Sequence, residues 1–399
     1  MSTAKKGGSI HSVMGRPTTG ALSSFSPLIR AEIKKLRGAH AGWGPSTLLV
    51  ELQQNARLAG LRLPSRSTIG QFLSEQGLSK SYHPNTSLPL KHCPNVEQPH
   101  DLWQVDGQGN TKVAGVGPIA MLNIKDTFSS VYVNAFPAKM KSLRGHPNAA
   151  DYQTAIRLGF IQHGLPKRLQ TDHASVFYDN HSKSPFPTTF CLWLIGLGIQ
   201  PCFSRFNQPT DQAQVERAHQ TIFNQVLAGR NDYLHWEQLF NACQNRRQQL
   251  NQSIPSRSTD NLPPLRRYPK AEHSGRFYHP DLEATHICLN RIYTFLAKGQ
   301  WFRMVANNRT ITIGGQVYYI KGTKYRQQLR ISFCAQERKL QFFGHQDTLL
   351  TALQIKGISK DVLMGDLGNL SKVQSLQLEL PINWKAIKTN TTLSDSNLV

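Results

Sequence analysis

Apolar residues in the middle of the chain recur with two periods, one typical of strands and the other typical of helices. Between residues 102 and 136 they form short runs, which predict three successive strands. Beyond residue 148, helical and strand-like runs alternate. This order predicts an α/β domain with a mixed β-sheet flanked by helices. The strands are expected at 102–106, 118–125, 130–136, 168–171 and 199–203, and the helices at 148–163, 187–197, 212–228 and 233–251.

Residues 26–78 follow a purely helical pattern. Pro27 and Pro45 suit the first turn of a helix, and Ser65 suits the N-cap of a third helix that stops at Gly77. Short basic helices joined by turns predict an all-α helix-turn-helix domain whose third helix reads a DNA groove, with a structural three-helix cap as the alternative. The side chains expected to contact DNA are Arg66, Ser67, Thr68 and Gln71.

Residues 285–345 contain short alternating apolar runs, and the pair Gly314-Gly315 between two of them predicts a hairpin. We interpret this region as a small β-barrel. Basic and aromatic residues on its predicted surface indicate binding to the DNA backbone, with protein–protein assembly as the alternative. These residues are Lys321, Lys324, Arg326 and Arg330, with Tyr318, Tyr319 and Tyr325.

A chain of 399 residues is too long for a single core, and polar or proline-bearing segments separate its patterned blocks. The prediction is therefore a multidomain protein. Its parts are a flexible basic arm at 1–25, the helical domain at 26–78, a linker at 79–100, the α/β core at 101–253, a second linker at 254–284, the barrel at 285–345 and a C-terminal extension at 346–399.

The formal net charge is +22 at pH 7, and its distribution is uneven. Residues 1–100 carry twelve Lys or Arg against four Asp or Glu, and residues 285–345 carry ten against one. Such an excess favours a polyanionic partner, of which nucleic acid is the commonest. Six cysteines without a Cys-x-x-Cys pair suggest neither a zinc ribbon nor a disulfide framework. No apolar run is long enough to span a membrane, so no membrane partner is expected.

Three acidic residues stand in distinctive surroundings. Asp106 ends the apolar run 102–105, Asp172 ends the run 168–171, and Glu216 lies inside a predicted helix. Two carboxylates at strand ends and one on a helix can converge into an oxygen cage for Mg²⁺, the ion that phosphoryl transfer uses. The sequence therefore predicts a metal site that acts on nucleic acid.

The surroundings of these acids resemble those of the integrase-core transposases, the retroviral-integrase-like DDE superfamily. The first match is Trp103-Gln104-Val105-Asp106, and the second runs from Thr171 to Phe177. The third, Asn207 to Arg217, resembles the family signature Pro-Gln-x-x-Gly-x-Val-Glu-Arg and is the most specific. The helices that begin near Trp43 and Ser65 also look like those of bacterial insertion-sequence transposases.

The resemblance implies a DNA transposase with a ribonuclease-H-like core, in which Asp106, Asp172 and Glu216 are catalytic and ligate metal. It implies two Mg²⁺ ions, with Mn²⁺ as a substitute, and cleavage of DNA 3′ ends followed by strand transfer. The implied partners are double-stranded DNA, both element ends and target, and further copies of the chain bound to that DNA. An accessory ATPase is left open, and the implied location is the nucleoid of a prokaryotic cytoplasm.

On the helix that carries Glu216, the side chains Arg217, His219 and Gln220 are expected to contact DNA, with a solvated helix face as the alternative. Asp211 is expected to cap this helix.

Three features depart from the family pattern. His173-Ala174 replaces the usual Asn-Gly, residues 212–214 replace a glycine, and the 44 residues from Asp172 to Glu216 exceed the usual spacing. We assign the excess to a polar surface loop at 178–187. These departures keep two rivals open: an inactive or domesticated DNA-binding protein with the same fold, and a ribonuclease-H-like nuclease that cuts without joining.

Overall fold

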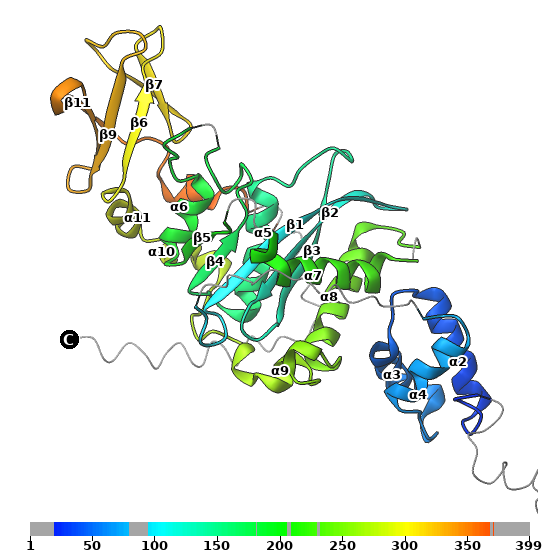
Figure 1. Cartoon of the computed structure of the whole chain (residues 1–399). Helices are drawn as coiled ribbons and strands as arrows, with labels where there is room; N and C mark the ends of the chain where they lie inside the picture. Colours follow the sequence, from blue (N-terminus) through cyan, green and yellow to red (C-terminus); the bar gives the residue numbers. More distant parts are fainter. Residues whose placement is uncertain are drawn as a thin grey trace, which may run out of the picture.

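The computed structural model describes residues 20–79, 95–180, 182–205, 209–229, 232–367 and 370. Most of the predicted arm at 1–25, most of the linker at 79–100 and much of the extension at 346–399 lie outside these residues. The molecule is elongated, with a helical domain at one end, two small β-sheets at the other and the α/β core between them (Figure 1).

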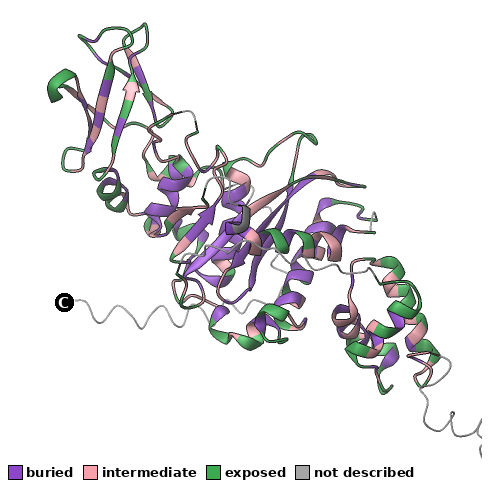
Figure 2. Ribbon diagram, viewed as in Figure 1, coloured by how far each residue is buried: buried purple, intermediate pink, exposed green. Residues whose placement is uncertain are grey.

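The core contains a five-stranded sheet of order β3-β2-β1-β4-β5. The strands β1, β2 and β3 are antiparallel, whereas β4 and β5 run parallel to β1. The predicted mixed sheet is therefore confirmed, and its strands are mostly buried (Figure 2). Their bounds are β1 Leu102–Val113, β2 Gly117–Asp126, β3 Tyr132–Lys139, β4 Arg168–Thr171 and β5 Gln200–Phe203.

Successive residues of β1 point to opposite faces of the sheet, and helices cover both faces. Trp103 contacts Phe160 of α5, whereas Gln104 and Asp106 face the side of α7. All four predicted core helices are present. They are α5 Ala149–His163, α6 Thr189–Gly196, α7 Ala213–Ile222 and α8 Trp236–Gln252, with the π-helical turn η4 Phe223–Leu227 directly after α7.

The N-terminal helical domain, residues 20–79, contains α2 (Pro27–Ala39), α3 (Pro45–Gln54) and α4 (Arg66–Glu75). Ser65 caps α4 as predicted, since its Oγ accepts a hydrogen bond from the Thr68 amide at 3.2 Å. The connection between α3 and α4 includes the 3₁₀ turn η2 (Ala56–Leu58) and is longer than the usual tight turn of a helix-turn-helix. The three helices are thus confirmed, while the helix-turn-helix assignment stays a prediction.

The segment 254–284, predicted as a linker, is instead packed against the core. Glu283 and Arg157 form an ion pair at 2.7 Å in which neither side chain is exposed to solvent. Arg276 donates hydrogen bonds to the carbonyls of Pro166 and Gly198. Short turns, several of them beginning with proline, carry this segment along the core. The elements are η5 Arg257–Thr259, α9 Pro264–Arg267, η6 Pro269–Ala271, η7 Pro280–Leu282 and α10 Glu283–His286.

The C-terminal strands form a sheet of order β11-β10-β9-β6 and a separate hairpin, β7-β8. These described sheets are not closed, so the predicted barrel is not confirmed. Their apolar residues, such as Ile311 and Phe342, belong to one cluster with the α/β core. The elements are α11 Leu289–Leu296, β6 Gln300–Met304, β7 Thr310–Ile313, β8 Gln316–Tyr319, β9 Gln328–Cys334, β10 Lys339–Phe343, η8 His345–Asp347, β11 Leu349–Gln354 and α12 Lys360–Met364. No described helix has the length and apolar character needed to cross a bilayer.

Candidate active site

Asp106 lies on β1, the middle strand of the sheet, and faces α7. Its neighbour on β2 is Asn123. Gln104, two residues earlier on the same face, donates hydrogen bonds to the Gln170 side chain and the Asp211 carbonyl. The first predicted acid is therefore held where β1, β2, β4 and α7 meet, and a quarter of its side chain remains accessible.

Asp172 directly follows β4 and is held in place by its own loop. Its Oδ1 accepts a hydrogen bond from the Ala174 amide at 3.0 Å. The ring of His173 packs against Tyr178 and Phe203, with centroids at 4.9 and 5.5 Å. Ala174 is not among the residues with positive φ. The turn therefore accepts alanine without strain where the family pattern has glycine.

Glu216 lies in the first turn of α7 and reaches the solvent. The predicted cap of this helix is wrong. Asp211 makes no cap and instead pairs with the Arg205 guanidinium at 2.9 Å. Asp211 is almost fully buried, so it anchors the start of α7 against the chain that leaves β5.

Asp106 acts electrostatically on both of the other acids. Burial raises the pKa of Asp172, and the nearby Asp106 carboxylate raises it further. Burial also raises the pKa of Glu216, again with Asp106 adding to the rise. Burial, Asp106 and Asp172 together raise the pKa of Tyr152, so this hydroxyl stays neutral. Asp106 is thus close enough to each of the other two acids to disfavour its ionisation.

A divalent cation suits this region because its donors are carboxylate oxygens, the ligands that Mg²⁺ prefers, and because their like charges repel. In the described part of the chain, however, no three His, Cys, Asp or Glu side chains are gathered closely enough to hold an ion as they stand. The acids are near one another but do not form a closed cage.

His219 occupies a different place from the one predicted. It is 5% exposed and lies between Asp106 and Asn123, so its side chain is turned towards the sheet. The Asn123 amide donates to Nδ1 at 2.6 Å, which leaves the proton on Nε2 for a hydrogen bond to Asp106 Oδ2 at 3.2 Å. The sequence spacing put His219 on the same helix face as Glu216. Its contact with Asp106 depends on the pairing of β1 with β2, which the spacing does not show.

The other predicted DNA contacts have mixed surroundings. Arg217 and Gln220 on α7 are exposed, as are Lys321, Lys324 and Arg326. On α4, Arg66, Ser67 and Gln71 are exposed and Thr68 is half-buried, with Gln71 bonded to Glu75 at 3.0 Å. These assignments stay predictions.

Two residues of the predicted basic and aromatic surface make contacts within the protein. Arg330 pairs with Asp347 at 2.9 Å and lies 4.0 Å above the Phe343 ring. Tyr318 is buried, and its hydroxyl accepts a hydrogen bond from the Lys356 amide. Tyr319 and Tyr325 remain exposed.

The predicted surface loop at 178–187 is a docking segment for the C-terminal sheet. Asp179 pairs with Arg303 of β6 at 3.2 Å. The Trp301 indole packs on the Phe186 ring at 4.7 Å and donates to the Pro185 carbonyl at 3.1 Å. The residues that lengthen the spacing between the second and third acids therefore contact the C-terminal sheet and join it to the loop that follows Asp172.

No family model matches the chain. The solved structures that it resembles include integrase catalytic cores and an intasome. The catalytic core of HTLV-2 integrase in complex with magnesium, in its trimeric form, is 18% identical with a TM-score of 0.32, covering 43% of this chain and 97% of that chain. The catalytic core of BIV integrase is 19% identical with a TM-score of 0.31, covering 43% and 96%.

A chain of the simian T-cell lymphotropic virus intasome in complex with PP2A regulatory subunit B56 gamma is 14% identical, with a TM-score of 0.37. The match covers 81% of this chain and 99% of that chain. At such TM-scores the likeness carries no weight for function, which has to come from the residues themselves.

Proposed function

We propose that this chain is a DNA transposase that binds element ends and catalyses metal-dependent 3′-end cleavage and strand transfer. The observation that supports the proposal is that Asp106, on β1, raises the pKa of both Asp172, which follows β4, and Glu216, on α7. Clustered carboxylates at the solvent edge of a sheet disfavour their own ionisation, so a structural role alone gives little reason for them.

In phosphodiester chemistry a pair of Mg²⁺ ions activates the attacking hydroxyl and stabilises the leaving oxygen. Asp106, the acid that influences both others, would hold these ions together with Asp172 and Glu216. His219 orients the Asp106 carboxylate through its Nε2 proton, and Asn123 fixes the tautomer that makes this possible.

A joining assay separates this proposal from its rivals. A labelled duplex that ends in the element's terminal sequence is incubated with plasmid target and Mg²⁺, and products are resolved under denaturing conditions. A transposase attaches the labelled strand covalently to the plasmid. Cutting without attachment would favour a nuclease, and binding without cutting would favour an inactive DNA-binding protein.

Replacing His219 by alanine is expected to slow joining about 10- to 100-fold, because the carboxylate that it orients loses its partner. The concentration of Mg²⁺ needed for half-maximal joining should rise in the same variant. The matched variant Gln220→Ala changes the adjacent exposed side chain and should alter DNA affinity rather than Mg²⁺ dependence. Equal Mg²⁺ curves for His219→Ala and wild type would contradict the assigned role.

The basic excess predicts that DNA binding weakens steeply with salt, by about tenfold or more between low and moderate salt. The exposed residues Lys321 and Lys324 are each expected to release about one counterion when DNA binds. Replacing both by glutamine should therefore lower the slope of log K against log salt concentration by about 2. The guanidinium of Arg330 already pairs with Asp347, so Arg330→Gln should leave the slope nearly unchanged. Titrations of labelled duplex at several salt concentrations measure these slopes.

A further inference from the structure

The catalytic helix α7 ends in an unusual way. Its last turn passes directly into η4, a π-helical turn from Phe223 to Leu227. Such turns are rare and often mark functional sites, since their wider backbone leaves carbonyl groups free for other partners. Two of these carbonyls are taken by side chains: Tyr233 donates to Val226 and Trp43 donates to Gln225, each at 2.9 Å. The second donor belongs to the N-terminal helical domain.

The backbone of the N-terminal helical domain approaches η4 very closely at Gly42. A methyl group at this position would overlap the carbonyl group of Asn224. Gly42 is not among the glycines with positive φ, so only this close approach opposes a larger residue. Glycine is therefore required by the contact with η4 rather than by its own conformation.

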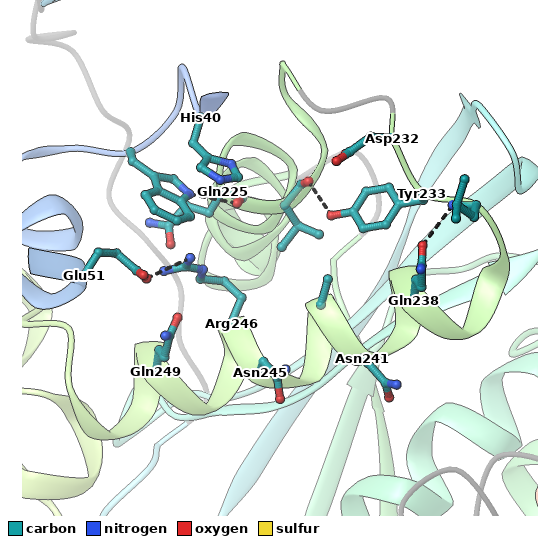
Figure 3. Close-up of a pocket in the computed structure, with 14 residues that line it drawn as sticks. His40, Glu51, Gln225, Asp232, Tyr233, Gln238, Asn241, Asn245, Arg246 and Gln249 are labelled. Carbon is teal, nitrogen blue, oxygen red and sulfur yellow. Dashed lines mark hydrogen bonds and ion pairs between the residues drawn. The ribbon is translucent and has the colours of Figure 1, made fainter. Parts of the chain in front are cut away.

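Trp43 is held rigidly between the two domains. It is 5% exposed, with the His40 ring stacked on it at 3.8 Å and the Arg246 guanidinium 4.3 Å from its centroid. Arg246 comes from α8 and pairs with Glu51 of α3 at 3.2 Å, as Figure 3 shows. Val50 of α3 joins the apolar cluster that contains Ala218 and Ile222 of α7. The domain thus contacts the turn that follows the helix bearing Glu216, and one of its residues belongs to the same apolar cluster as that helix.

This interface contains many polar groups. A cleft of about 560 Å³ that opens to solvent lies between α3, η4 and α8 (Figure 3). Gln225 and Arg246 each keep a buried polar atom without a hydrogen-bond partner among the described residues. Each domain also has its own apolar cluster. Changes at the contact should therefore leave both domains folded.

We propose that Gly42 and Trp43 are positioning residues for the reaction. Their contacts with η4 hold α7, and with it Glu216, in a position set by the N-terminal helical domain. Recognition of the element end by this domain and placement of the third acid are therefore coupled. This inference rests on the proposed function. It adds a role to the N-terminal helical domain beyond holding DNA.

The test compares Gly42→Ala with Gly38→Ala in the full-length chain. Both add one methyl group to the same domain, but Gly38 lies in α2 with nothing within 4 Å of the added carbon. A third variant, Trp43→Phe, keeps an aromatic ring and removes the donor to Gln225. Three quantities are measured: affinity for end DNA, the joining rate at saturating DNA with its Mg²⁺ dependence, and amide hydrogen exchange over residues 213–227.

Gly42→Ala and Trp43→Phe are expected to bind end DNA within about twofold of wild type and to join it about tenfold more slowly or worse at saturation, since small displacements of catalytic groups are costly. Half-maximal joining should need more Mg²⁺, and exchange over 213–227 should be faster. Gly38→Ala should match wild type in all three measurements.

Unchanged exchange over 213–227 in both interface variants would overturn the proposal, whatever the activity of the wild type. Faster exchange with an unchanged joining rate would overturn the positioning role. A wild type that joins no DNA would instead count against the proposed function, and the exchange measurement alone would then decide whether the N-terminal helical domain holds α7.

Discussion

Asp172→Asn is expected to lower the rate of DNA cutting and joining by about a thousandfold or more, while end-DNA affinity stays within about twofold. The substitution keeps the shape of the side chain and its hydrogen bond from Ala174, but it removes one of three carboxylates that would hold metal. Single-turnover rates with labelled end DNA, at saturating enzyme and Mg²⁺, measure the effect.

The same variant should not be less stable than wild type. Because the fold raises the pKa of Asp172, its ionised form opposes folding, and the stability of the wild type falls as pH rises through that pKa. The melting temperature of Asp172→Asn relative to wild type should therefore increase from about pH 4 towards pH 7 in metal-free buffer. A loss of activity accompanied by a lower melting temperature at neutral pH would show that asparagine damages the fold and would contradict this account.

Glu283→Gln is expected to destabilise the core by about 3–5 kcal/mol, because it leaves the fully buried Arg157 guanidinium without a counter-charge. Glu283 also accepts hydrogen bonds from the Trp193 indole at 2.7 Å and from the Tyr278 hydroxyl. The midpoint and slope of urea unfolding, followed by tryptophan fluorescence, give the change in unfolding free energy.

The matched control is Asp281→Asn, two residues away in the same segment. Its side chain is 88% exposed and lies 3.7 Å from His279, so the unfolding free energy should change by less than about 1 kcal/mol. If Glu283→Gln were equally mild, the segment 254–284 would behave as the linker that the sequence suggested.

The α/β core was predictable because its strands and helices are set by local periodicity. The runs around Val105 and Leu169 are apolar and short, and the helices of 148–163 and 233–251 carry their own repeating apolar positions. Asp172 directly follows β4 and Glu216 lies on α7 as predicted, whereas Asp106 lies within β1, which continues to Val113, and not at its end. Ser65 as an N-cap follows from purely local chemistry, and the structure confirms it.

The errors concern contacts between distant segments. Nothing near Glu283 or Arg276 in the sequence reveals that they meet Arg157 or the carbonyl of Pro166, so a proline- and arginine-rich stretch was taken for a linker. The contacts of His219 with Asp106 and Asn123 were not foreseen, because these partners lie 96 or more residues away in the sequence. Local patterns also could not show that the loop at 178–187 docks on β6, or that the C-terminal sheets stay open.

The central claim is that Asp106, Asp172 and Glu216 act as one metal-dependent site, and a cycle of variants tests it most directly. Single-turnover joining with Mg²⁺ is measured for Asp106→Asn, Glu216→Gln and the double variant. Groups that act as a unit are strongly non-additive. The account predicts that each single variant loses joining almost completely and that the double variant is little worse than either. Losses that multiply independently, or a single variant that joins DNA at close to the wild-type rate, would contradict it.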